Sequence, residues 1–166
     1  PMAPIVLAKK LNVESWLESI SQDSLDLGVM LPSSSLHFVL IHILQQPLIC
    51  TSANVSGQPM IIGDEEAGSL LSSVNGLLSH DRKIHHRLDD TIFRDMSDHV
   101  LCIRPGRGMV PYYVKSKGQS DDLLTQTVAL GAELKSTFSL NNRDKYVLSP
   151  YHGDLHSLGN LQAFEH

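Results

Sequence analysis

The sequence predicts an α/β (α+β) fold, in which a twisted mixed sheet with helices is followed by the first β-hairpins of a second domain. Three observations lead to this prediction. Hydrophobic residues make up 42% of the 166 residues and charged residues 19%, as in proteins with a packed core. Short apolar runs end at Pro, Gly or Ser, which is typical of strands. Residues 36–44 instead repeat apolar side chains with the period of a helix.

The first half of the chain predicts three strands and three helical segments. The strands are Pro4–Ala8, Leu27–Leu31 and Leu48–Cys50, and the helical segments are Asn12–Ser19, Leu36–Leu44 and a helix that begins at Gly63–Glu66. Pro47 limits how far the second helix runs. We expect Asp64 to cap the third helix. Its apolar positions are Ala67, Leu70, Leu71, Val74, Leu77 and Leu78.

The second half predicts a hairpin, a linker and the opening of another domain. Strands at Thr91–Phe93 and Val100–Ile103 are expected to pair around a polar turn. Three further strands are predicted at Thr127–Leu130, Thr137–Leu140 and Tyr146–Leu148. The chain therefore divides into residues 1–116, a linker over 117–127 and an incomplete domain over 128–166. That last part, about forty residues, is too short to bury a core of its own.

Composition excludes several classes of function. The net charge of −5 and pI of about 5.9 argue against non-specific nucleic-acid binding, although they permit a local basic patch. Cys50 and Cys102 are expected as buried free thiols, and without a Cys-x-x-Cys pair no zinc site is expected. The longest apolar stretch is too short to span a bilayer and no secretory leader is visible, so we expect a cytoplasmic protein without a membrane partner.

Thr51–Gly57 is rich in small polar side chains and follows the apolar run Pro47–Cys50. Small side chains let backbone N–H groups approach a ligand, and hydroxyls and amides add neutral donors, so the segment is suited to an oxyanion or phosphate. A Ser/Asn turn between two elements explains the same composition. Composition alone leaves both interpretations open.

Charged residues supply further candidates. Arg82, Arg87, Arg104 and Arg107 could donate to phosphate oxygens or be solvated surface charges. The pair Asp89-Asp90 could hold magnesium beside a triphosphate, or serve as a cap or as a partner of Arg87. Among the nine histidines, the pairs His85-His86 and His152/His156 are the candidate metal ligands, but their spacing favours no metal site.

Four ordered segments resemble the hydrogenase-maturation carbamoyltransferases of the HypF type. They are Leu27–His37, Thr51–Pro59, His80–Asp90 and Ala129–Phe138, the last followed by Gly153-Asp154-Leu155. The resemblance implies a YrdC-like domain that uses ATP, with its magnesium, and carbamoyl phosphate to make carbamoyl adenylate. It also implies an actin/sugar-kinase-like domain that passes the carbamoyl group to the C-terminal cysteine of a hydrogenase-maturation partner.

The same resemblance implies roles for individual residues. Thr51, Ser52, Asn54, Ser56, Thr91 and Arg104 are expected to bind the nucleotide or carbamate, and Arg82, Arg87, Asp89 and Asp90 to neighbour phosphate or magnesium. Gly131 and Lys135 match a second-domain phosphate hairpin. No catalytic residue is assigned. The family's upstream Lys/Arg motif has no counterpart before Pro4, so we expect a truncated chain that is inactive alone.

Two other functions fit parts of the pattern. A threonylcarbamoyl-adenylate synthase of tRNA modification shares the YrdC-like fold, but the segment after Ser116 argues against it. A double-stranded RNA-binding module is suggested by the basic residues from Arg82 to Arg87 with Arg104 and Arg107.

Overall fold

The computed structural model describes residues 2–11, 15–70, 72–115, 126–142 and 145–165. The chain splits into two compact units, Pro1–Leu48 with Asp90–Val110 and Ile49–Asp89 with Pro111–His166. Each unit contains one four-stranded sheet. The mixed α/β fold is as predicted.

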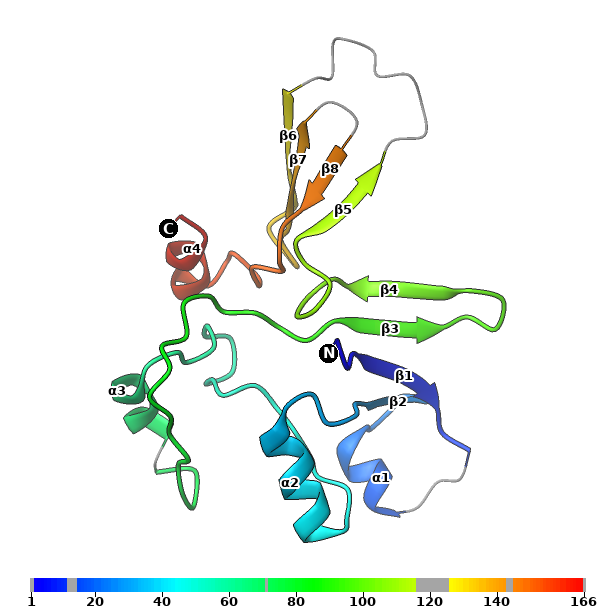
Figure 1. The fold of residues 1–166 in the computed structure, drawn as a ribbon, viewed down its shortest axis with the longest axis vertical. Helices are drawn as coiled ribbons and strands as arrows, with labels where there is room; N and C mark the ends of the chain where they lie inside the picture. The colour runs from blue at the N-terminus through cyan, green and yellow to red at the C-terminus, as the bar shows by residue number, and fades with distance from the viewer. Residues whose placement is uncertain (1, 12–14, 71, 116–125, 143–144, 166) are drawn as a thin grey trace. The chain divides into compact units, whose positions relative to one another are not determined.

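The sheet of the first unit has the strand order β2-β1-β3-β4 (Figure 1). β1 (Ile5–Lys9) pairs antiparallel with β2 (Asp26–Val29) and parallel with β3 (Ile92–Asp95). β3 pairs antiparallel with β4 (Val100–Arg104). The sheet is therefore mixed, and the β3–β4 hairpin confirms the predicted pairing.

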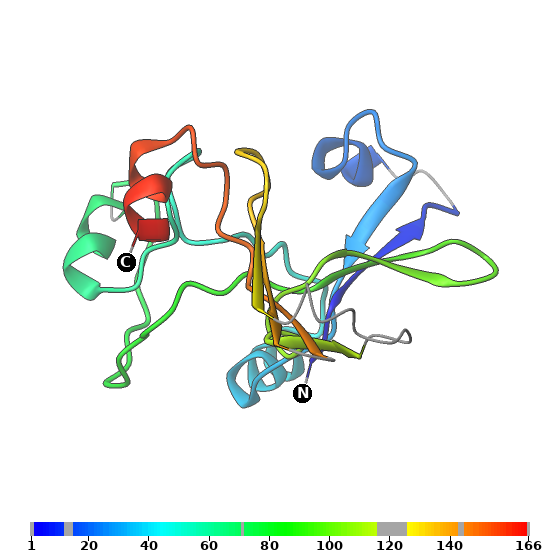
Figure 2. The same cartoon turned by 90° about the horizontal axis from the view of Figure 1, so that it is seen from above.

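Two helices of the first unit, α1 (Ser15–Ile20) and α2 (Ser35–Leu44), lie on opposite sides of β1 and β2 (Figure 2). The Ser34 hydroxyl caps α2 by accepting from the His37 N–H at 3.2 Å. Gln45, with a φ of 51°, ends α2. No helix among the described residues is long and apolar enough to cross a lipid bilayer.

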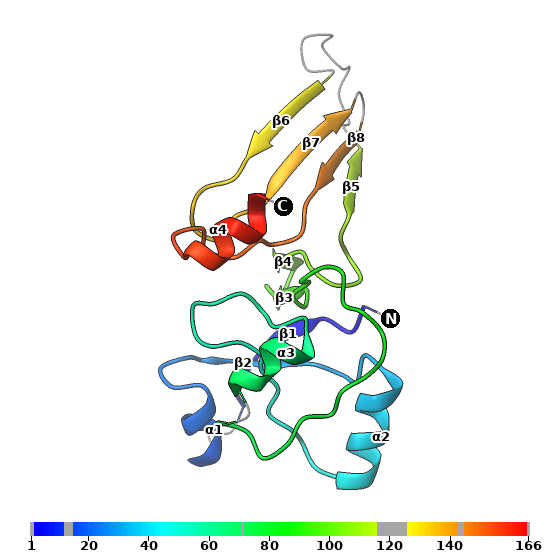
Figure 3. The same ribbon diagram turned by 90° about the vertical axis from the view of Figure 1, so that its left-hand side faces the viewer.

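The second unit contains an antiparallel sheet with the order β5-β8-β7-β6 (Figure 3). Its strands are β5 (Tyr112–Lys115), β6 (Gln126–Leu130), β7 (Phe138–Asn142) and β8 (Lys145–Leu148). The last three confirm the predicted strands, whereas β5 and α4 (Leu158–Glu165) were not predicted. The predicted linker lies outside the described residues, except that 126 and 127 belong to β6.

Two element predictions are wrong. Leu48–Cys50 is an exposed irregular segment, because no described strand pairs with it. The long helix expected from Gly63 consists of α3 (Asp64–Ala67) and a 3₁₀ turn, η1 (Gly68–Leu70). The residues beyond it that the structure describes are not helical, since Ser, Asn and Gly are poor helix formers.

The residues that the structure describes do not form the packed core that the composition predicts. Among the residues that the structure describes, Ala67 is the only apolar residue that is buried. In α2, Phe38 and Ile43 are 67% and 69% exposed, and no α2 residue is buried. Cys50 and Cys102 are free, as predicted, but Cys50 is exposed because its segment joins no sheet. Burial raises the pKa of the half-buried Cys102 thiol.

Candidate functional site

The segment Thr51–Gly57 forms a hydrogen-bonded turn. The Asn54 amide donates to the carbonyl oxygens of Val55 at 3.1 Å and Gln58 at 3.0 Å. Its side-chain oxygen accepts from the Ser52 hydroxyl. Gly57 has a φ of 79°, a conformation that favours glycine. Asn54 therefore shapes the loop from within, through its own side chain.

Hydroxyl groups in this turn are open to solvent. Thr51, Ser52 and Ser56 are exposed, whereas Asn54 is half-buried. Hydroxyl donors beside a turn can bind carboxylate or phosphate oxygens without adding charge. The ligand contacts of Thr51, Ser52, Asn54 and Ser56 stay a prediction.

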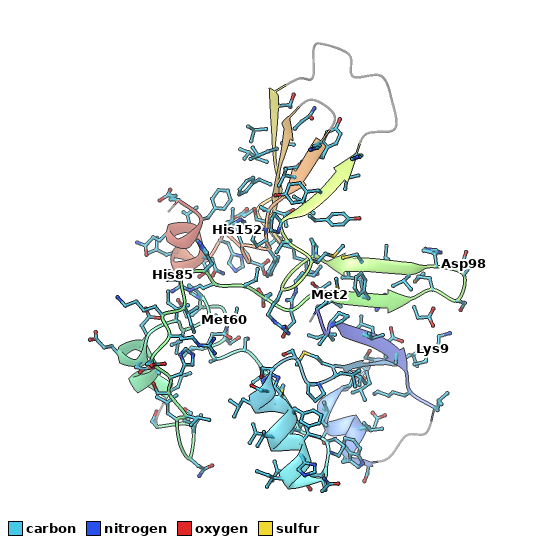
Figure 4. All side chains as sticks on the ribbon, viewed as in Figure 1. Met2, Lys9, Met60, His85, Asp98 and His152 are labelled. Carbon is cyan, nitrogen blue, oxygen red and sulfur yellow. The ribbon has the colours of Figure 1, made fainter. Side chains whose placement is uncertain are left out.

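Arg87 ties together two parts of the second unit. Its Nε donates to the carbonyl oxygen of Met60 at 2.6 Å, and its Nη2 lies 3.9 Å from Glu66 Oε2 (Met60 is labelled in Figure 4). Because the guanidinium is half-buried against these partners, Arg87 stabilises the segment. Its predicted role beside phosphate stays untested.

An open hollow of about 670 Å³ lies in the second unit, between α3 and the polar segment that follows. Exposed Arg82 lines it. The charged lining residues are Asp64, Glu65, Glu66, Asp81, Arg82 and Lys83. Carboxylates outnumber basic side chains, so the hollow by itself has the wrong charge for a triphosphate.

Thr91 and Arg104 belong to the first unit, at the start of β3 and the end of β4. Thr91 has an exposed fraction of 0%. Its hydroxyl accepts from the Gly106 N–H at 3.0 Å and donates to the Arg107 carbonyl oxygen at 3.1 Å. The structure thus uses the Thr91 hydroxyl to hold the loop after β4.

Asp90 accepts hydrogen bonds from two arginines, Arg104 at the end of β4 and Arg107 in the segment that follows. Its carboxylate accepts from Arg107 Nε at 2.8 Å and also from Arg107 Nη2, while its carbonyl oxygen accepts from Arg104 Nε at 3.1 Å. The structure describes Asp89 as half-buried. Across the described residues, no group of three or more His, Cys, Asp or Glu could hold a metal ion.

Gly131 and Lys135 lie in a turn that is bound to a second loop of the same unit. A Cβ at Gly131 would clash with the Thr137 carbonyl oxygen. Lys135 has a φ of 53°, and its N–H donates to Asp154 Oδ1 at 2.8 Å. The Leu155 N–H donates to the Glu133 carbonyl oxygen at 2.8 Å. The turn is therefore fixed in shape, and the Lys135 side chain is exposed.

His152 sits between two aromatic rings, a contact that the sequence did not indicate (Figure 4). Its ring stacks on Phe138 at 5.5 Å between centroids and meets Phe164 of α4 edge-on at 5.2 Å. Burial lowers the pKa of His152, and the buried Nε2 has no hydrogen-bond partner among the described residues. This arrangement favours a neutral packing residue.

Family models match both parts of the chain. The Sua5/YciO/YrdC family model, described as telomere recombination, matches residues 2–106. The model of the HypF Kae1-like domain matches residues 123–166.

Curated proteins and solved structures are similar to nearly the whole chain. Carbamoyltransferase HypF of Rhodobacter capsulatus is 34% identical over 99% of this chain and 22% of its own length, and HypF2 of Cupriavidus necator is 33% identical over 96% and 22%. The crystal structure of T. kodakarensis HypF matches with a TM-score of 0.86 and 29% identity over 99% of this chain and 21% of that one. A full-length HypF in a phosphate- and nucleotide-bound form matches with a TM-score of 0.84 and 29% identity over 98% and 25%. The chain spans about a fifth of the length of its curated relatives.

Proposed function

The chain belongs to the Sua5/YciO/YrdC family over residues 2–106, and we therefore propose that it functions in an ATP-dependent carbamoyltransferase of the HypF type. That enzyme forms carbamoyl adenylate from ATP and carbamoyl phosphate. It then passes the carbamoyl group to a C-terminal cysteine of a partner protein in nickel–iron hydrogenase maturation. The observation that supports this most is the order of the two family matches in one chain, 2–106 and then 123–166.

The adenylating step joins carbamate to AMP. Hydrolysis of carbamoyl phosphate releases phosphate and carbamate. A carbamate oxygen then attacks the α-phosphorus of ATP, the α–β phosphoanhydride bond breaks, and pyrophosphate leaves. Protein groups contribute mainly by positioning and by hydrogen bonds to oxygens that gain charge. The exposed hydroxyls of Thr51 and Ser56 are the donors we assign to carbamate or phosphate oxygens.

Fewer arginines are proposed to neutralise the triphosphate than the sequence alone suggests. Arg87 and Arg107 are engaged with Glu66 and Asp90, so we assign them structural roles. Arg82 stays a proposed phosphate neighbour, and Arg104, whose Nε donates to the Asp90 carbonyl oxygen, stays a proposed nucleotide-binding residue. Because the Asp90 carboxylate is paired with Arg107, we assign magnesium to the phosphates of ATP, with no ligand from Asp90.

The rival functions fit less well. A threonylcarbamoyl-adenylate synthase would explain the match over 2–106 but not the match to the HypF Kae1-like domain over 123–166. An RNA-binding module needs free basic side chains, yet Arg87 and Arg107 are paired with carboxylates and the net charge is −5.

The test measures the exchange of radioactive pyrophosphate into ATP, catalysed by the complete natural protein. We expect exchange that depends on carbamoyl phosphate. Exchange with threonine and bicarbonate instead would establish the tRNA-modification chemistry and contradict the proposal, as would no exchange with either substrate.

A variant of the loop tests the assigned residues. Asn54→Ala removes the amide that closes the turn, and we expect it to weaken ATP binding by about tenfold, as one lost hydrogen bond of ~1.4 kcal/mol would. Calorimetry measures the affinity. Asn75→Ala, at an exposed position of the same unit, is the matched control. Equal affinities in the two variants would remove the loop from the binding site.

A further inference from the structure

We propose that Gly159 of α4 is a positioning residue that couples two candidate sites of the second unit, the nucleotide loop (Thr51–Pro59) and the second-domain hairpin (Gly131–Lys135). The proposal rests on the proposed function, since that function gives each site its ligand. The contacts themselves come from the structure alone.

Gly159 allows α4 to approach the nucleotide loop closely. A Cβ at this position would lie 2.9 Å from Pro59 Cδ and 3.1 Å from Gln58 Oε1. Carbon atoms in contact normally stay about 3.5–4.0 Å apart, so any larger residue must push the helix and the loop apart. Figures 1 and 3 show α4 beside the segment that joins α2 to α3.

The loop transmits a displacement at its end because it is hydrogen-bonded throughout. The Gln58 carbonyl oxygen accepts from the Asn54 amide at 3.0 Å, and the Gln58 N–H donates to the Val55 carbonyl oxygen at 2.9 Å. The Ile61 N–H donates to the Ala53 carbonyl oxygen at 2.8 Å. Moving Gln58 and Pro59 therefore moves Asn54, the side chain that shapes the turn.

Gly159 is also connected to the second-domain hairpin, through its neighbour Asn160 and Asp154. Its neighbour Asn160 donates to the Asp154 carbonyl oxygen at 3.2 Å. Asp154 Oδ1 in turn accepts from the Lys135 N–H at 2.8 Å. Gly153, with a φ of 88°, allows this contact, since a Cβ there would lie 2.9 Å from Asn160 Nδ2. A continuous set of contacts thus joins the nucleotide loop to the hairpin.

Gly159→Ala tests the coupling in the complete protein. Alanine favours a helix more than glycine does by about 1 kcal/mol, so loss of function would come from the contact and not from a weaker helix. We expect the KM for ATP to rise about fivefold or more, the lower range of coupling between sites, with kcat changing less. We also expect faster hydrogen exchange at the N–H groups of Gln58 and Ile61.

Two further variants make the result specific. Pro59→Ala removes the ring atoms that a Cβ at 159 would meet, so Gly159→Ala should raise the KM and the exchange rate less in a Pro59→Ala background, relative to Pro59→Ala alone, than it does in the wild type. Gly68→Ala is the matched control, because Gly68 has a φ of −53° and open space around it, and it should leave both readouts unchanged.

The outcomes separate this proposal from the proposed function. If Gly159→Ala behaves as Gly68→Ala does in both KM and hydrogen exchange, the coupling is overturned. If Gly159→Ala has the same effect with and without Pro59→Ala, Pro59 is not the contact and the proposal also fails. If the wild-type protein shows no carbamoyl-phosphate-dependent exchange, the proposed function fails, whereas faster hydrogen exchange in Gly159→Ala would still support the coupling.

Discussion

Thr91 is fully buried at the start of β3, and its hydroxyl both accepts from Gly106 and donates to Arg107. These two partners are consecutive residues in the segment that follows β4. The hydroxyl therefore sets the position of the loop in which Arg104, Arg107 and Asp90 meet. If the loop binds a nucleotide, Thr91 contributes by positioning.

Thr91→Val keeps the shape of the side chain but leaves the buried Gly106 N–H and the part-buried Arg107 carbonyl oxygen without this hydroxyl partner. An unsatisfied buried group costs about 1–3 kcal/mol. We expect the protection of the Gly106 N–H against hydrogen exchange to fall by roughly tenfold or more. Thr91→Ser, which keeps the hydroxyl, is the control. Wild-type protection in Thr91→Val, or a loss in Thr91→Ser as large as that in Thr91→Val, would contradict the role given to the hydroxyl.

The sequence identifies such residues better than it identifies their roles. Thr91, Arg104 and Asp90 stand out because polar groups flank two apolar strands. Their partners lie 14 to 17 residues away, so only the β3–β4 register brings them together. The same holds for Arg87, whose partner Met60 is 27 residues distant.

At the scale of elements, α4 is held to the second sheet by aromatic contacts. His152 packs against Phe138 of β7 and Phe164 of α4, which also meet each other at 6.4 Å. Because burial lowers the pKa of His152, the folded unit favours the neutral ring. Below the ordinary His pKa of about 6.5, the unfolded state binds more protons than the folded state, so stability is lost as the pH falls.

We therefore expect α4 to undock more readily as the pH falls from about 7.5 to 5.5. The measurement is the hydrogen-exchange protection of α4, corrected for the intrinsic effect of pH. His152→Phe should abolish the dependence while keeping the aromatic packing, and His156→Gln, at an exposed position, should not. An unchanged pH dependence in His152→Phe would assign the effect to another group.

The helix α2 and the β3–β4 hairpin, which have local signals, were predicted, whereas β5, whose partner strand is distant, was not. α2 has its own cap at Ser34 and its own period, and the β3–β4 hairpin closes over a short turn. β5 pairs with β8, some thirty residues later in the chain, and no local pattern shows that pairing. Leu48–Cys50 has the composition of a buried strand, but no partner strand among the described residues.

For the molecule as a whole, composition predicted a packed core, which the residues that the structure describes do not form. The exposed apolar side chains of α2, such as Phe38 and Ile43, have the composition of an interior surface, while the chain spans about a fifth of its relatives' length. The order of the domains was recognisable from the sequence because each carries its own motif. The family matches over 2–106 and 123–166 agree with that order.

We propose that the complete protein transfers a carbamoyl group to a cysteine at the C-terminus of an acceptor protein. Mass spectrometry of that acceptor, after incubation with the complete protein, ATP and carbamoyl phosphate, tests it most directly. An acceptor whose C-terminal cysteine is replaced by serine is the control. We expect a carbamoyl group on the terminal cysteine and none on the serine variant. An acceptor that stays unmodified while ATP is converted to AMP would contradict it.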